Sequence, residues 1–246
     1  MSENVLSHRV ATRRAALTAL SAGAAVTGLG ACGALSSDDL PDSAASPDGT
    51  SGTAPSPGAT PTCVLTPEGT EGPFYVDVDL VRRDIAEGRP GVPVTLRLTV
   101  VDAVSCEPLS DAEVDVWHAD ATGVYSGITS EGTDGESFLR GIQVTDEEGT
   151  VEFATLYPGW YDRRTVHFHV KVHVEGDVVH TGQLYFDDEI NEQVSQVDPY
   201  VGRGGRETTN DNDMFYPSSG RESTIQATGS PDEGYEAVMV LGVQPD

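Results

Sequence analysis

Apolar and polar residues alternate along much of the chain beyond residue 90, which is the pattern of half-buried β-strands. In the stretch VPVTLRLTV at residues 92–100, every second residue is apolar. The same alternation predicts further strands at residues 112–117, 150–157, 165–174, 182–186 and 235–243, with turn signals at 147–149, 157–160 and 174–177. Short strands separated by frequent turns indicate an all-β protein with an antiparallel β-sandwich fold.

Helical periodicity is scarce. The one segment where a helix is expected is Asp77–Gly88, in which Leu80, Val81 and Ile85 form a short amphipathic stretch. The fold should therefore contain little helix.

Residues 1–31 have the layout of an export signal. Arg13 and Arg14 precede an uncharged run of small and apolar residues, Ala15–Ala31. This run is shorter than the roughly 20 apolar residues that a membrane span needs. The stretch LGAC, Leu29–Cys32, is similar to a bacterial lipobox, in which the cysteine carries the lipid. We therefore expect an exported protein, either a cell-surface lipoprotein anchored at Cys32 or extracellular. The alternative is an ordinary signal followed by a buried cysteine.

The rest of the chain divides by composition. Residues 32–62 are rich in Ser, Pro, Gly, Asp and Thr, and are expected to form a disordered linker. Residues 63–246 are long enough for one β-sandwich domain with a sizeable core. Two cysteines remain there, Cys63 and Cys106, and in an exported protein they are expected to form a disulfide.

The charge balance narrows the possible partners. The formal net charge is −26, which argues against nucleic acid or an anionic membrane surface as a partner. Contact with a membrane is expected only through the lipid anchor. Lys171 is the single lysine of the sequence, so most Schiff-base chemistry is excluded unless that residue carries it.

Histidines gather on one face of the strand expected at 165–174. His167, His169, Lys171 and His173 alternate with an apolar set that faces the core. A His-x-His pair on one strand face can place two imidazoles on a single metal ion, although a solvated surface would show the same pattern. His118, His173 and His180 are expected to be structural or solvated.

Four stretches together resemble the secreted branch of the intradiol ring-cleavage dioxygenases. They are TPEGTEGPFY (66–75), VDVWHADATGVYSG (114–127), GTVEFATLYPGWYDRRTVHFHV (149–170) and TGQLYF (181–186). The likeness runs over almost all of residues 63–246.

The resemblance implies a non-haem Fe(III) cofactor held by Tyr125, Tyr161, His167 and His169. Phenolates are hard anionic donors that favour Fe(III), and tyrosine is an unusual ligand for zinc. The implied reaction is cleavage of a small aromatic diol by O2, which gives a cis,cis-muconate-type dicarboxylic acid. Tyr161 would then be the ligand that the substrate displaces.

Four further polar residues match or neighbour the family pattern. Arg164 matches the arginine that stabilises negative charge developing on the ring, and Gln183 matches a pocket glutamine near the iron. A buried hydrogen-bonding role fits Gln183 equally well. Arg140 is either close to the site or purely structural, and Arg163 is expected to form a surface ion pair.

One departure from the family separates this chain from its intracellular members. Only five residues, DRRTV, lie between Tyr161 and His167, where those members have a longer loop. A more open site is expected. Two other functions remain open: a non-catalytic metal- or ligand-binding β-sandwich lipoprotein, and a zinc-dependent hydrolase using the same histidines. Under both, the tyrosines would be dispensable.

Overall fold

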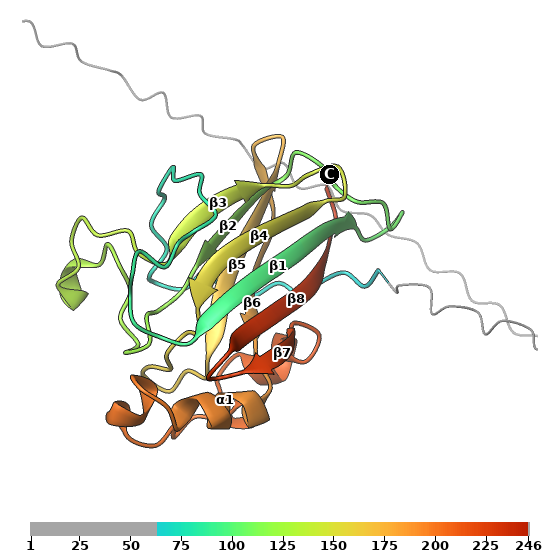
Figure 1. Cartoon of the computed structure of the whole chain (residues 1–246). Coiled ribbons are helices and arrows are strands. Elements are labelled where there is room, and N and C mark those ends of the chain that lie inside the picture. Colours follow the sequence, from blue (N-terminus) through green and yellow to red (C-terminus); the bar gives the residue numbers. More distant parts are fainter. Residues whose placement is uncertain (1–62, 246) are drawn as a thin grey trace, which may run out of the picture. The chain divides into compact units, whose positions relative to one another are not determined.

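The computed structural model describes residues 63–245, so the expected signal, lipobox and linker of residues 1–62 lie outside the described part. Eight strands and one α-helix make up the regular structure of this part (Figure 1). Their bounds are β1 Pro93–Asp102, β2 Glu113–Trp117, β3 Arg140–Val144, β4 Thr150–Leu156, β5 His167–Val174, β6 Asp177–Tyr185, α1 Asp188–Ser195, β7 Gln226–Ser230 and β8 Gly234–Val243.

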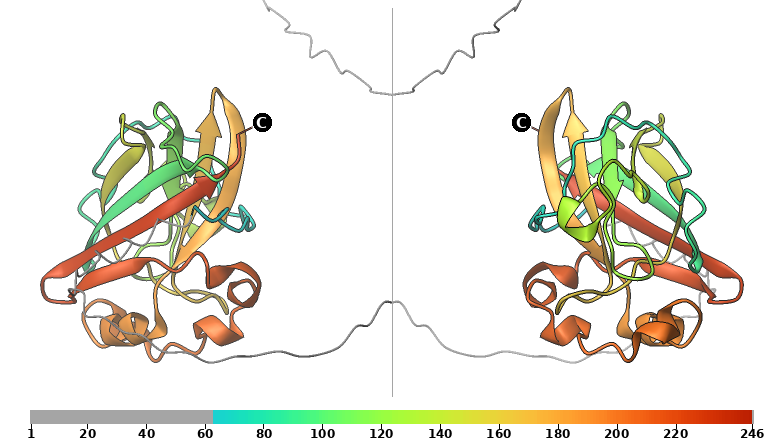
Figure 2. Two further views of the ribbon diagram at one scale, coloured as in Figure 1. Left: turned by 90° about the vertical axis from the view of Figure 1, so that its right-hand side faces the viewer. Right: turned by 90° about the vertical axis from the view of Figure 1, so that its left-hand side faces the viewer.

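The strands form two four-stranded sheets, which confirms the expected β-sandwich; β3 and β7 were not predicted from the sequence. Their orders are β4-β1-β8-β7 and β3-β2-β5-β6. All neighbours are antiparallel except β1 and β8, which run parallel from Val94 opposite Tyr235 to Asp102 opposite Val243. The expected antiparallel β-sandwich is thus confirmed, with one parallel pair where the last strand of the chain enters the centre of the first sheet alongside β1. Figure 2 shows α1 and the helical turns that follow it gathered at one end of the strands.

The core lies between the inward faces of the two sheets. Val94, Leu96 and Leu98 of β1 are buried, as are Phe168 and Val170 of β5. Each such side chain contributes about 1.5–3 kcal/mol through removal of its apolar surface from water. The face of β5 that points away from this core carries the histidines, so the sandwich holds the site rigidly from behind.

Residues 77–88 are extended rather than helical, which corrects the one helix expected from the sequence. The backbone N–H of Arg82 donates to the carbonyl of Ile142, and that of Ile85 donates to the carbonyl of Ala154. These bonds satisfy the exposed edges of β3 and β4. The buried side chain of Ile85 adds to the core. Pairing with two open sheet edges therefore outweighs the weak helical pattern.

The α-helix lies instead at Asp188–Ser195, where the sequence predicted none. Asp188 and Glu189 stand in its first turn, where negative charge is favourable, and Val194 is buried. Three 3-10 turns (Thr129–Glu131, Tyr200–Arg203, Asn210–Asn212) and a π-helical turn (Tyr216–Gly220) complete the helical content of the described residues. Within residues 63–245, no helix combines the length and apolar character that crossing a bilayer requires.

Residues 63–76 form an extended segment that we call the N-terminal strap. It begins at the disulfide between Cys63 and Cys106, which confirms the expected pairing. Its backbone then donates from Thr66 to Gly242 and from Gly69 to Thr181, so that it crosses from the first sheet to the second. The strap thereby reaches the histidine face of β5.

Removal of the disulfide is expected to lower the free energy of unfolding substantially. The bond closes a loop with a sequence separation of 43 residues. In the chain-entropy description, a loop of this size stabilises the folded state by roughly 4 kcal/mol. The Cys63→Ser/Cys106→Ser double variant should therefore unfold at clearly lower denaturant concentration, measured by circular dichroism. A midpoint equal to that of the parent protein would contradict the expectation.

Candidate metal centre

Four side chains from three separate segments converge on one point at the histidine face. The phenol oxygens of Tyr125 and Tyr161 are 3.1 Å apart, and the Tyr161 oxygen is 3.2 Å from Nε2 of His167. Nε2 of His167 is in turn 3.1 Å from Nε2 of His169. The structure thus brings together all four residues that the sequence proposed as metal ligands.

Local backbone structure places each of these side chains. His167 and His169 lie on the same face of β5 because side chains alternate along a strand. Tyr161 precedes a tight turn in which the Arg164 N–H donates to the Tyr161 carbonyl (2.6 Å). Asp162 and Arg163 both have positive φ there, 26° and 63°. This turn allows only five residues to separate the tyrosine from the first histidine.

The rings are held in orientation by their neighbours. Nδ1 of His167 is 2.7 Å from the carbonyl oxygen of Thr165, so Nδ1 donates and Nε2 keeps its lone pair. Trp117 stacks on His169 with ring centroids 4.9 Å apart, and Phe74 stacks on Tyr125 at 4.6 Å. Such an arrangement of oriented imidazoles is typical of metal ligands.

Burial sets the protonation states of the four groups. It lowers the pKa of His167 and of His169 well below the usual value, so both imidazoles are neutral at neutral pH. Burial also raises the pKa of the Tyr125 phenol well above its usual value and raises that of Tyr161. A cation that binds the phenolate forms must therefore displace the phenolic protons, and its binding should release protons.

The spacing of the four donor atoms fits a single ion. Two ligands that each lie about 2.1 Å from one ion, at right angles, are about 3 Å apart. The successive separations of 3.1, 3.2 and 3.1 Å match this value. Among the described residues, no three or more His, Cys, Asp or Glu side chains are grouped to hold a metal. A four-ligand set at this point would therefore need the two tyrosines.

A cavity of about 690 Å³ opens in front of these donors, within the usual range for small-molecule sites. Tyr161 and His169 line it, whereas Tyr125 and His167 lie behind them and are buried. The other lining residues are Thr70, Gly72, Pro73, Phe74, Gly123, Glu131, Asp162, Arg163, Arg164, Met214 and Phe215. The N-terminal strap therefore supplies one wall of the cavity.

Arg164 and Gln183, both proposed from the sequence, meet beside the donor atoms. Nη2 of Arg164 donates to Oε1 of Gln183, which also accepts the hydroxyl of Tyr185 (2.9 Å). Nε2 of Gln183 donates to the Thr70 carbonyl of the strap (2.9 Å). Arg164 reaches the cavity, whereas Gln183 is buried and does not line it. Gln183 thus joins Arg164 to the cavity wall.

The sequence model of the family described as "Dioxygenase" matches residues 70–201. An intradiol ring-cleavage dioxygenase from Tetranychus urticae has a solved structure that superposes with a TM-score of 0.71 and 35% identity. That match covers 74% of this chain and 96% of the mite protein. The chain belongs to the intradiol ring-cleavage dioxygenase family.

Other intradiol dioxygenases are more distant or match over a shorter region. The dioxygenase domain of a carbohydrate-binding fusion protein from a cellulolytic Streptomyces is 26% identical, with a TM-score of 0.57 over 74% of this chain and 99% of that domain. Catechol 1,2-dioxygenase of Acinetobacter baylyi is 34% identical over 101 residues, which cover 39% of this chain. The match spans 32% of that enzyme, about a third of its length.

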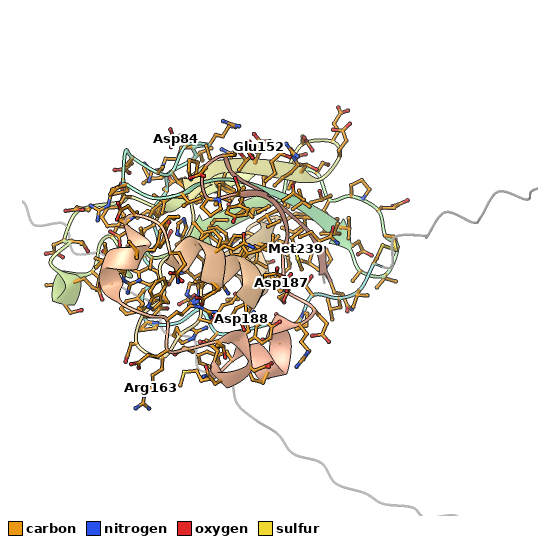
Figure 3. All side chains as sticks on the ribbon, turned by 60° about the horizontal axis from the view of Figure 1, so that its bottom comes forward. Asp84, Glu152, Arg163, Asp187, Asp188 and Met239 are labelled. Atoms are coloured by element: carbon orange, nitrogen blue, oxygen red, sulfur yellow. A yellow bond between two sulfur atoms is a disulfide. The ribbon has the colours of Figure 1, made fainter. Side chains whose placement is uncertain are left out.

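The remaining polar residues that the sequence singled out have distinct positions in this intradiol fold. Arg140 is buried and donates to the carbonyls of Ser126 and Phe74, so it joins the Tyr125 loop to the strap. Arg163 is exposed at the cavity rim, and Figure 3 shows it projecting away from the body of the protein. The ion pair expected for Arg163 is absent among the residues the structure describes.

The other three histidines of residues 63–245 stand apart from the donor cluster. His118 is buried, with Nδ1 2.8 Å from the Ala119 carbonyl and Nε2 2.7 Å from the Thr155 hydroxyl. His180 is also buried, and His173 is partly exposed. Of the two expected possibilities, structural or solvated, burial favours the structural one for His118 and His180.

Several residues around the site were missed by sequence reasoning. Asp213 accepts a hydrogen bond from Arg164 but lies in the stretch NDNDMFY, which has no periodic or motif signal. Trp117 could have been found from the sequence, because this apolar residue lies on the otherwise polar face of its strand. Lys171 is buried, donates to Glu71 of the strap and lies 3.6 Å from the ring centroid of Tyr75. Lys171 therefore holds the N-terminal strap in place, and these contacts occupy its ammonium group.

A methyl group at Gly72 is expected to disturb the donor cluster. Gly72 has a φ of +75°, and a Cβ there would meet Cε1 of His169 at 3.3 Å. We expect Gly72→Ala to destabilise the protein by about 1–3 kcal/mol, since a left-handed non-glycine residue alone costs that order. The added methyl should also weaken retention of a metal, measured by elemental analysis after dialysis.

Gly88→Ala is the matched control for this substitution. Gly88 has a φ of +71°, nearly the same as that of Gly72, but a Cβ at Gly88 meets nothing within 4 Å. It should show the backbone cost alone, with metal retention unchanged. Equal metal loss in both variants would mean that the contact with His169 is unimportant.

Proposed function

We propose that this protein is a non-haem Fe(III)-dependent enzyme that cleaves a catechol-type aromatic ring with O2 and forms a cis,cis-muconate-type dicarboxylic acid. The observation that carries the proposal is the convergence of two phenol oxygens and two imidazole nitrogens at the floor of a cavity. The names of the similar proteins, which include catechol 1,2-dioxygenases, support an aromatic diol as substrate.

The donor types favour Fe(III) over zinc and over Fe(II). Tyr125, Tyr161, His167 and His169 would hold the ion, and two phenolates are hard anionic donors that stabilise the ferric state. When bound there, Fe(III) supplies a Lewis acid for the two catechol oxygens and accepts electron density from the ring, which makes the ring reactive toward O2. Zinc has no redox chemistry and rarely takes tyrosine as a ligand.

Tyr161 is the donor best placed to receive a proton from the substrate. Its ring lines the cavity, whereas Tyr125 is buried behind it. Its phenolate oxygen would stand among the donors, 3.2 Å from Nε2 of His167, where it could accept a proton from a catechol hydroxyl. A protonated Tyr161 phenol would hold the ion less strongly than the phenolate would.

Arg164 is the group placed to stabilise negative charge on the ring. Its guanidinium reaches the cavity from the strand end next to His167. A preorganised cation in a partly dry site contributes through electrostatic stabilisation of the transition state. Phe74 and Phe215 give the cavity apolar walls that suit an aromatic ring and restrict water.

We also propose that the protein acts outside the cytoplasm, anchored through a lipid at Cys32. The twin arginine at Arg13 and Arg14, the uncharged run after it and the LGAC stretch support this location. Mass spectrometry of the mature N-terminus should find a lipid-modified Cys32. Cleavage elsewhere, or an unmodified Cys32, would contradict the anchor.

The absorption spectrum of the iron-loaded protein tests the proposed function. We expect a visible tyrosinate-to-Fe(III) band that shifts when catechol is added without air, because the substrate replaces a ligand. Admission of air should then consume O2 and catechol in equal amounts and yield the ring-opened diacid. A protein that stays colourless after loading with iron, or that binds catechol without O2 uptake, would overturn the proposal.

A further inference from the structure

Asp213 is a buried carboxylate beside the proposed catalytic arginine. It lies in the segment after α1, far from the β5 strand in sequence, and its side chain has no exposed area. Its Oδ2 accepts Nε of Arg164 at 2.8 Å and the backbone N–H of Thr165 at 2.9 Å. Two bonds thus tie Asp213 to the start of the strand that carries the histidines.

The other oxygen of Asp213 organises the opposite side of the cavity. Oδ1 accepts the backbone N–H groups of Phe215 (2.8 Å) and Tyr216 (3.0 Å). Phe215 lines the cavity, and the Arg164 guanidinium carbon lies 4.7 Å from its ring centroid. The two oxygens of one carboxylate therefore bind the arginine and the aromatic wall at the same time.

One nitrogen of the Arg164 guanidinium, Nη1, is not used in the bonds to Asp213 and Gln183. Nε donates to Asp213 and Nη2 donates to Gln183. The Arg164 side chain also contacts the Tyr185 hydroxyl, and within residues 63–245 neither the bond to Asp213 nor the bond to Gln183 uses Nη1. Arg164 lines the cavity. Because the guanidinium is planar and rigid, fixing Nε and Nη2 fixes the direction of Nη1.

We propose that Asp213 is a positioning residue that aims the Arg164 guanidinium at the substrate ring and couples this orientation to Phe215. Asp213 does not contact the reacting atoms. It acts through Arg164. A substrate ring that packs against Phe215 would then lie next to Nη1 of Arg164. The inference rests on the proposed ring-cleaving function and adds a residue that the sequence pattern did not indicate.

Asp213→Asn tests the proposal in the full-length, iron-loaded protein. Asparagine keeps one oxygen for the Phe215 and Tyr216 N–H groups, but its amide N–H₂ would face the Arg164 donor. A misplaced catalytic group can cost roughly 100-fold in rate. We expect kcat for catechol cleavage to fall about 10- to 100-fold while KM changes less than about threefold, with iron content and visible spectrum preserved.

A double-mutant cycle separates positioning from a general structural effect. In an Arg164→Ala background, Asp213→Asn should cause no further loss of kcat, because the group that Asp213 aims is gone. Losses that multiply independently would overturn the proposal.

Asp146→Asn is the matched control: its Oδ1 also accepts two loop N–H groups, from Glu148 and Thr150, and it lies outside the cavity. Its kcat should stay within about twofold of the parent value.

Arg164→Lys keeps the proposal testable if Asp213→Asn fails to fold. Lysine retains the positive charge but lacks the planar fork that Asp213 and Gln183 hold. We expect its kcat to lie within about threefold of that of Arg164→Ala. A lysine variant with near-parental kcat would show that orientation is unimportant and would overturn the inference. Absence of ring cleavage in the parent protein would instead reject the proposed function itself.

Discussion

The Tyr125→Phe variant is expected to lose at least about 100-fold in ring-cleaving activity and much of its bound iron. Its phenol oxygen is one of the four converging donors, 3.1 Å from that of Tyr161. Loss of groups that merely support a ligand already costs 10- to 100-fold in metal affinity or activity, so loss of a ligand should cost more. Iron per chain after dialysis and the intensity of the visible band measure the effect.

Tyr157→Phe is the matched control for this variant. Tyr157 is equally buried, but its hydroxyl donates to Oδ1 of Asn191 at 2.7 Å, away from the donor cluster. Loss of this hydrogen bond should cost about 1–3 kcal/mol of stability and leave iron content unchanged. Full iron content and an unaltered spectrum in Tyr125→Phe would remove that tyrosine from the ligand set and reopen the zinc hydrolase and binding-protein alternatives.

Arg164→Ala is expected to reduce kcat by roughly 100- to 1,000-fold with a smaller effect on KM. Removal of one preorganised donor from a charge-stabilising site typically has this size. The Arg164 side chain is almost fully enclosed by Asp213, Gln183 and Phe215. Steady-state kinetics with catechol measure the loss, and the visible spectrum should persist because the four donor residues are intact.

The neighbouring arginine provides the contrast. Arg163 differs from Arg164 in exposure and not in charge, and it projects away from the body of the protein (Figure 3). An exposed charge is screened by water and salt, so Arg163→Ala should keep at least about a tenth of the parental kcat. Equal losses for the two substitutions would indicate that net positive charge, and not the position of Arg164, supports the reaction.

Local alternation in the sequence was sufficient to predict six of the eight strands and the histidine half of the donor cluster, whereas β3 and β7 carry no such pattern. His167 and His169 share a face of β5 for the same reason that Phe168 and Val170 share the core face. The positions of Tyr125 and Tyr161 came from resemblance to a family. Local pattern alone gives no reason for two loops to meet over one strand.

The parts that the sequence could not predict depend on contacts between distant segments. The helix expected at 77–88 is replaced by bonds to β3 and β4, which lie more than 50 residues further along the chain. The parallel pairing of β1 with β8 also joins segments that are far apart in the sequence, and so does the bond of Arg164 to Asp213. No periodicity within a short window carries information about such partners.

The disulfide at the start of the N-terminal strap has a mechanical consequence. Tension applied to the chain before Cys63 reaches Cys106, in the connection between β1 and β2, through a covalent bond. The hydrogen bonds that hold Thr70 and Phe74 against the cavity therefore carry little of that load. The protein can therefore be held by its N-terminal side, for example on a solid support, without a pull that separates the strap from the donor cluster.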